Sequence, residues 1–241
     1  MTSRMQSFLL VMGAMAFCAV TARAEELASV EKQIIQRWQK HRSMRAKLTQ
    51  SETTEAKGNK ATQEGEGVFE FMRKGDQVLC RLETKSSMKL AVGDQNLTFD
   101  FATLRVCDGT FTYELSERMG TKTARKTRPD PLSAADVKTL LATLHGANTL
   151  KLLDEQTVGN QRVFAIEATP QSNAPGRPYK TMVYYFSQEH GVLIRQEARD
   201  PKGKVVQSTE YSQLEFDGKI DPKRFEFKAP EGVIVRDLSG G

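Results

Sequence analysis

The spacing of apolar side chains changes early in this sequence. Between residues 25 and 44, apolar positions recur three and four residues apart, which predicts one amphipathic helix. Its apolar stripe consists of Leu27, Val30, Ile34 and Trp38. Beyond residue 46, apolar and polar positions alternate, and turn dipeptides such as Asp108-Gly109 separate the alternating runs. This second pattern predicts β-strands joined by hairpins.

The alternating runs follow one another almost to the end of the chain. They lie at residues 46–56, 64–73, 77–85, 97–107, 110–116, 161–169, 179–188, 192–200, 204–216, 224–228 and 233–237. Parallel neighbours would need a long crossover, usually a helix, between each pair of strands. The sequence has no such helix between most of these runs, so an antiparallel meander is expected.

A second helix interrupts the strands at residues 131–146. Ser133 is a suitable N-cap with Asp136 three positions later, and Gly146 stands where a helix commonly ends. Its apolar face consists of Val137, Leu140, Leu141 and Leu144. The basic segment 117–130 and the Pro-containing segment 170–178 are predicted to be loops.

Large apolar side chains gather on one face of several predicted strands. They are Phe69, Phe71, Phe99, Phe101, Phe164, Ile166, Met182, Tyr184 and Phe186. A sheet with one apolar face must bury it, by closing on itself or under helices. About eleven strands and two helices therefore predict a mainly β fold, an incomplete antiparallel barrel made of a strongly curved sheet with an apolar interior. The residues alone leave open whether this interior is a packed core, which composition favours, or a ligand cavity.

The first 24 residues have the features of a secretory signal peptide. Arg4 supplies a positive start, residues 8–20 are apolar, and Ala22-Arg23-Ala24 is a cleavage signature. Residues 25–241 are therefore expected to be one exported, soluble domain, with no later run of the ~18 apolar residues that a membrane-spanning helix needs. Loss of the two arginines lowers the formal net charge from +5 to +3. Nucleic-acid binding is not expected at so small a charge.

Two cysteines, Cys80 and Cys107, remain in the expected mature chain. Export would permit a disulfide between them, and closing this loop would stabilise the fold by about 3–4 kcal/mol. Two buried thiols are the other interpretation. Residue spacing does not decide between them.

The sequence has none of the common catalytic or metal-binding motifs. Its three histidines, His41, His145 and His190, lie far apart and are expected at the surface, and the cysteines form no C-x-x-C pair. Nucleophile elbows and phosphate-binding loops are also missing. No catalytic residue, metal or cofactor is therefore expected, and the chain is not expected to be an enzyme.

Several local strings occur in a characteristic order. They are Lys47-Leu48-Thr49-Gln50, the run from Glu64 to Arg73, Val106-Cys107-Asp108-Gly109-Thr110-Phe111, Arg224-Phe225-Glu226-Phe227 and Pro230-Glu231-Gly232-Val233. Together they resemble the LolA-like superfamily, the periplasmic carriers of outer-membrane lipoproteins. Leu48 replaces the usual Phe of the first string, the segment from Cys80 to Cys107 is longer, and the usual sheet tryptophans are missing. The longer segment predicts an extra strand pair around residues 88–101.

The resemblance implies a periplasmic, monomeric carrier whose apolar cavity holds acyl chains under a lid formed by residues 131–146. Inner-membrane donor and outer-membrane acceptor proteins would be its partners. It also implies that Arg73 latches the lid through hydrogen bonds to the lid backbone. Arg73 shares a strand face with Phe69 and Phe71, although a rim arginine in solvent is the other interpretation. A sensing or regulatory module that binds an envelope protein is the alternative function.

Overall fold

The computed structural model describes residues 25–56, 59–93, 95–129, 135–172 and 179–240. The predicted signal peptide lies outside these residues. The N-terminal helix covers residues 25–38 and ends earlier than predicted, because β1 begins at Ser43 and its first residues already pair with β2. The predicted apolar stripe of this helix is buried in the core.

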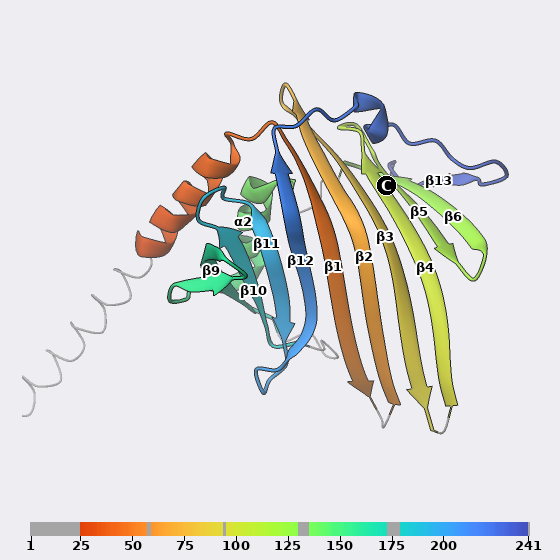
Figure 1. Ribbon diagram of the computed structural model, residues 1–241, viewed down its shortest axis with the longest axis horizontal. Coiled ribbons are helices and arrows are strands. Elements are labelled where there is room, and N and C mark those ends of the chain that lie inside the picture. The colour runs from red at the N-terminus through yellow and green to blue at the C-terminus, as the bar shows by residue number, and fades with distance from the viewer. Residues whose placement is uncertain (1–24, 57–58, 94, 130–134, 173–178, 241) are drawn as a thin grey trace, which may run out of the picture.

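The strands form one large sheet (Figure 1). They are β1 (Ser43–Ala56), β2 (Asn59–Lys74), β3 (Gln77–Val92), β4 (Gln95–Cys107), β5 (Thr112–Arg118), β6 (Thr121–Thr127), β7 (Asn148–Leu152), β8 (Gln156–Val158), β9 (Gln161–Pro170), β10 (Thr181–Ser187), β11 (Leu193–Arg199), β12 (Val205–Phe216) and β13 (Val235–Asp237). Their order is β13-β6-β5-β4-β3-β2-β1-β12-β11-β10-β9-β7, with β8 paired to β9 beside this path.

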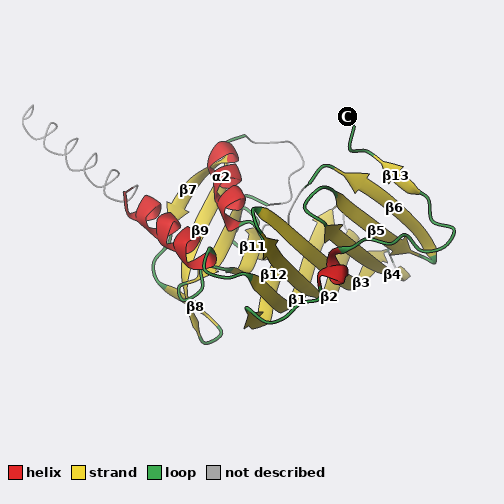
Figure 2. Ribbon diagram, turned by 90° about the horizontal axis from the view of Figure 1, so that it is seen from above, coloured by secondary structure: helices red, strands yellow, loops and turns green. Residues whose placement is uncertain are grey.

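The sheet is curved and open. β7 and β13 stand at opposite ends of the strand order, and Figure 2 shows the sheet curving around the side on which α2 lies. Neighbouring strands are antiparallel, except for the short parallel pair of β13 and β6. The predicted mainly β, incomplete barrel is confirmed, and the described residues form thirteen strands in place of about eleven.

The predicted loop at residues 117–130 is wrong. β5 and β6 form a hairpin there, joined at Met119 and Gly120, whose φ angles are 50° and 75°. Two successive positive φ angles are typical of the two-residue turn that matches strand twist. The extra strand pair expected around residues 88–101 is also wrong, because β3 and β4 simply run on and pair from Cys80 and Cys107 out to Val92 and Gln95.

The predicted strand at residues 224–228 is wrong as well. The chain forms a short 3-10 helix there, η1 (Pro222–Phe225), because the Asp221 side chain accepts a hydrogen bond from the Lys223 amide and Pro222 fits the first helical position. β7 and β8, which the sequence analysis did not predict, occupy the segment between α2 and β9.

The second helix, α2 (Val137–Ala147), is shorter than predicted. Its N-cap is Asp136, whose side chain accepts a hydrogen bond from the Thr139 amide, and the predicted cap Ser133 lies outside the described residues. Gly146 lies inside the helix, which ends at Asn148. We call the face that carries Phe69 and α2 the inner face, and the opposite face, which carries η1, the outer face (Figure 2).

Candidate functional site

The helix α2 covers part of the inner face. Three of its four predicted lid side chains are buried in the core and Leu140 packs against them from a half-buried position. The buried three are Val137, Leu141 and Leu144. A helix of 11 residues is marginally stable on its own in water. Packing of this apolar face against the core therefore stabilises α2.

The nine side chains predicted to line a cavity fall into two groups. Phe69, Phe71, Ile166 and Phe186 have 0% of their surface exposed and belong to one core cluster with both helices. Tyr184 belongs to the same cluster, burial raises its pKa to about 12, and Phe164 and Met182 pack against the cluster. Phe99 and Phe101 lie farther along β4, on the inner face by strand register, and are half-buried outside this cluster. In this structure, the apolar side chains directly under α2 therefore pack against one another.

Arg73 lies where the two helices approach each other. Its Nε donates a hydrogen bond of 3.1 Å to the His41 carbonyl, just beyond the N-terminal helix. Its guanidinium carbon lies 5.5 Å from the ring centre of Trp38 and 5.8 Å from that of Phe71. Burial lowers the pKa of Arg73, and the negative charge of Asp136, the N-cap of α2, opposes that shift. Arg73 is therefore hydrogen-bonded to the segment just after the N-terminal helix and attracted by the charge at the start of α2.

A hollow of about 750 Å³ opens between the N-terminal helix and the strands β7 and β9. Its apolar lining comes from Leu27, Val30, Leu150, Leu152, Leu153 and Phe164. Charged residues such as Glu26, Lys151 and Glu155 also line it. Pockets for small ligands commonly have volumes of roughly 300–1,000 Å³ and combine apolar walls with a few polar groups. This hollow has both properties.

The fold brings together two histidines that are far apart in sequence. The rings of His41 and His190 lie 5.2 Å apart, and both contact Phe216. His41 Nδ1 also lies 3.0 Å from the Asp217 carboxylate. Burial lowers the pKa of His190, against the opposing effect of the Glu189 charge. His41 and His190 are half-buried, with 14% and 28% of their side chains exposed, whereas His145 is exposed as predicted.

Cys80 and Cys107 lie directly opposite each other in the register of β3 and β4. Both are buried, and neither is disulfide-bonded in this structure. A hydrogen bond with the Cys80 side chain is the main cause that lowers the pKa of Cys107 to about 6, against the opposing effect of burial. The thiolate is the form that reacts with disulfides.

We expect these two thiols to form a disulfide when the protein is exposed to oxidised glutathione. Each sulfur loses its proton, the new S–S bond forms, and the two electrons reduce glutathione disulfide to two thiols. Intact-mass measurement should detect the loss of two hydrogen atoms. The free energy of unfolding should be about 3–4 kcal/mol larger for the oxidised form than for the reduced form. The Cys107→Ala variant is the control, because its stability should be the same in oxidising and reducing buffer. An unchanged mass after oxidation in denaturant and refolding would contradict the expectation.

The described part of the chain contains no group of three or more His, Cys, Asp or Glu side chains arranged to hold a metal ion. Within the same residues, no helix is both long and apolar enough to cross a membrane. The hollow beside the N-terminal helix, with its apolar walls and charged residues, is the candidate ligand site on the inner face.

Comparisons with known proteins give structural likenesses only. No family model matches the chain, and no curated protein matches it in sequence. One similar structure is an uncharacterized conserved protein from Thermus thermophilus, at 12% identity and a TM-score of 0.48, covering 85% of this chain and 98% of that one. Another is the MucA/MucB complex of Pseudomonas aeruginosa, at 15% identity and a TM-score of 0.44, covering 82% of this chain and 61% of that one.

A LolA superfamily protein from Nitrosomonas europaea is also similar, at 12% identity and a TM-score of 0.26, covering 81% of this chain and 97% of that one. The similar structures thus include a member of the superfamily that the local strings resemble. Likenesses at this level carry no inference about ligand or partner. The proposals below rest on the residues of this chain.

Proposed function

We propose that this protein is a periplasmic carrier or binding protein for acyl chains of lipids or lipoproteins. The observation that carries the proposal is the hollow of about 750 Å³ beside the N-terminal helix, whose apolar lining continues into the core under α2. Residues 1–24 would be the signal peptide that directs the domain 25–241 to the periplasm. Inner-membrane donors and outer-membrane acceptors would be its protein partners.

The chemistry of the hollow suits a hydrocarbon chain. Leu27 and Val30 supply one wall, and Leu150, Leu152 and Phe164 supply the other. Each methylene that leaves water for such a surface contributes about 0.8 kcal/mol. Four charged residues also line the hollow, Glu26, Lys151, Asp154 and Glu155, and would lie near the polar end of the ligand. A fatty acyl chain therefore fits this lining better than a polar metabolite does.

A longer ligand would need more room than the hollow offers, because Phe69, Phe71 and Ile166 are fully buried beneath the helices. Movement of α2 would provide it. The contacts of Val137, Leu141 and Leu144 would then be exchanged for contacts with the acyl chain, so the apolar area buried would change little. The lid and the ligand would compete for the same surface.

A charge introduced into the hollow should weaken the binding of an acyl chain. We expect Leu152→Lys to weaken binding of a fluorescent fatty acid by at least about tenfold, because an unpaired ammonium group would face the hydrocarbon. Fluorescence titration of the purified protein measures the affinity. The matched control is Leu97→Lys, at an exposed leucine on β4 that does not line this hollow. Equal affinities of both variants and the unchanged protein would contradict the proposed site.

Arg73 should govern exchange of the ligand. We expect Arg73→Leu to speed release of the bound fatty acid several-fold, because the variant loses the hydrogen bond to His41 and the attraction to Asp136. Stopped-flow fluorescence measures the release rate. Arg42→Leu is the control, since Arg42 is a neighbouring but exposed arginine. The same release rate in both variants would exclude a latch role for Arg73.

The second candidate is a sensing or regulatory module that binds an envelope protein. The packing of Phe69, Phe71, Ile166 and Phe186 at 0% exposure favours it, because a filled interior offers little space for lipid. Mass spectrometry of protein purified from its native compartment separates the candidates. A copurified lipid or lipoprotein supports the carrier, and a stoichiometric protein partner without lipid supports the sensor.

A further inference from the structure

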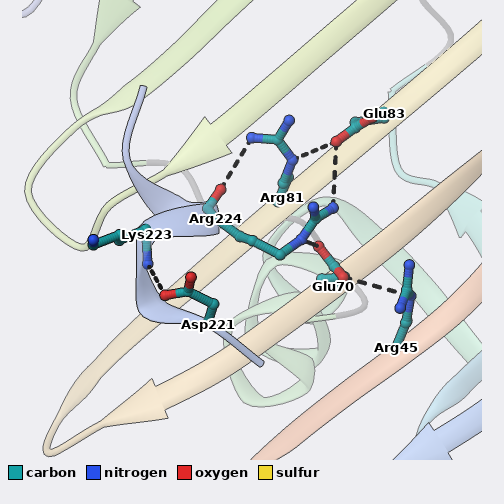
Figure 3. Close-up of polar contacts among 7 residues, drawn as sticks. All are labelled: Arg45, Glu70, Arg81, Glu83, Asp221, Lys223 and Arg224. Atoms are coloured by element: carbon teal, nitrogen blue, oxygen red, sulfur yellow. Dashed lines mark hydrogen bonds and ion pairs between the residues drawn. The ribbon is translucent and has the colours of Figure 1, made fainter. Parts of the chain in front are cut away.

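The outer face of the sheet already binds one segment of this chain. Residues 222–228, which we call the strap, cross the outer face beside β2 and β3 (Figure 3). Arg224 Nε donates a hydrogen bond of 2.6 Å to the Glu70 carboxylate, and Arg81 donates one of 3.0 Å to the Arg224 carbonyl. Phe225 is 2% exposed, and the ring of Phe227 stacks on Tyr113 at 5.0 Å. The strap is therefore held by carboxylate–arginine pairs and aromatic packing.

The strand register arranges the outer side chains in rows that run across β1 to β5. The strap covers the row formed by Arg45, Glu70, Arg81, Val106 and Tyr113. The next row, which we call the apolar row, is Lys47, Val68, Glu83, Leu104 and Leu115. The third, which we call the acidic row, is Thr49, Glu66, Lys85, Ala102 and Glu117.

The apolar and acidic rows line an uncovered groove of about 520 Å³, which we call the outer groove. Val68, Leu104 and Leu115 are half-buried on its floor. Neighbouring strands are about 4.8 Å apart, so five strands span about 19 Å, the length of about six residues of extended chain. The groove has room for one extended peptide segment lying parallel to the strap.

The lining of the outer groove has three carboxylates, Glu66, Glu83 and Glu117, and three cations, Lys47, Arg81 and Lys85. An adjoining hollow of about 920 Å³ shares the acidic row and adds two carboxylates, Glu64 and Asp100. In the described part of the chain, neither of these carboxylates nor that of Glu66 has an ion-pair partner within 4.0 Å. Lys47 and Lys85 are the cations beside them that the strap does not engage. The groove and the adjoining hollow together have five carboxylates and three cations in their lining, so a cationic partner is favoured and an anionic lipid headgroup is disfavoured.

We propose that the outer groove binds an extended, basic segment of a partner polypeptide with aromatic or aliphatic side chains between its cations. The strap shows which chemistry this face accepts, since an arginine meets Glu70 while two phenylalanines pack beside it. The same combination of carboxylates and apolar side chains is repeated in the next two rows, of which the strap reaches Glu83 through Arg224 at 3.4 Å. Exposed Met119 in the lining of the adjoining hollow offers an adaptable apolar contact.

The test uses a synthetic peptide of about six residues that alternates arginine with phenylalanine, matched to the length of the groove. Its twin has glutamate in place of arginine. The basic peptide should bind the full mature chain with an affinity at least about tenfold higher than that of the acidic twin, and increasing salt should weaken it. Glu66→Lys should reduce the affinity for the basic peptide at least about tenfold.

The matched control is Glu189→Lys, which makes the same charge change at an exposed residue of the β10–β11 turn. It should leave the affinity for the peptide unchanged. Fluorescence of the single tryptophan, Trp38, verifies that both variants are folded. Equal binding of the two peptides, or an equal effect of both substitutions, would overturn the proposal.

Three further results would assign the groove to another occupant and also overturn the proposal. Vesicles of phosphatidylcholine and phosphatidylglycerol that displace the peptide would indicate a lipid surface. A dimer in sedimentation that Glu66→Lys dissociates would indicate a second copy of the chain. If the peptide bound only to the Arg224→Met variant, in which the strap is released, then the peptide would occupy the site of the strap. The fatty-acid titration at the inner hollow is a separate measurement, so either proposal can fail alone.

Discussion

Replacing Gly191 with alanine is expected to destabilise the protein by about 3–5 kcal/mol. Gly191 lies at the turn between β10 and β11 with a φ of 66°. An added Cβ would overlap the Ile34 carbonyl oxygen and stand 2.9 Å from the Trp38 amide nitrogen, both of them backbone atoms of the N-terminal helix. Side-chain rotation cannot relieve such a contact, so the helix would have to move off the inner face.

Urea denaturation measures the loss, and a red shift of Trp38 fluorescence would report its exposure to water. Gly203→Ala is the matched control, because Gly203 also has a positive φ, 82°, but no atom within 4 Å of its added Cβ. Gly203→Ala should destabilise the protein by about 1–2 kcal/mol, which is the cost of the positive φ alone for a residue with a Cβ. If both substitutions cost the same, then close packing against the N-terminal helix contributes nothing measurable.

Replacing Glu70 with glutamine is expected to cost about 2–3 kcal/mol and to release the strap. The Glu70 side chain is 2% exposed and lies between Arg224 at 2.6 Å and Arg45 at 3.5 Å. The two arginines are 39% and 54% exposed, so water solvates them once the carboxylate is gone. The loss should therefore be smaller than the roughly 3–5 kcal/mol of a fully buried pair.

A double-mutant cycle with Arg224→Met should give a coupling energy of about 2 kcal/mol with Glu70→Gln. Limited proteolysis should cut residues 217–228 faster in either single variant, because the strap loses its ionic contact. The comparison pair is Glu155 with Arg162, 73% and 67% exposed, whose coupling should stay below about 1 kcal/mol. A coupling energy below about 1 kcal/mol between Glu70 and Arg224 would show that aromatic packing of Phe225 and Phe227 alone holds the strap.

The helices and most strands could be predicted because their signals are local. The stripe of Leu27, Val30, Ile34 and Trp38 has the helical period, and all four side chains are buried in the core. The predictions were wrong where one or two residues change the secondary structure that the surrounding pattern favours. Met119 and Gly120 turn a basic segment into a hairpin, and Pro222 after Asp221 gives a 3-10 helix where alternation predicted a strand.

The contents of the interior could not be predicted from alternation. A strand pattern places Phe69 and Phe71 on one face but does not say what lies above that face. The structure places Trp38 there, with its ring 4.5 Å from that of Phe71. It also separates Phe99 and Phe101 from the other aromatic residues, because β4 runs on past the helices. The hollow of the inner face depends on Leu150 and Leu152 of β7, a strand that the sequence analysis did not include.

The fold class, the buried face of each helix and most of the hairpins follow from the chain's own residue periods and turn chemistry, because these signals lie within short segments. Contacts between distant residues follow only from the assembled sheet. Arg73 lies between His41 and Asp136, Cys80 lies opposite Cys107, and Glu70 binds Arg224. These contacts depend on the strand order and register of the whole sheet, which no short stretch of sequence encodes. The rows of the outer groove exist for the same reason.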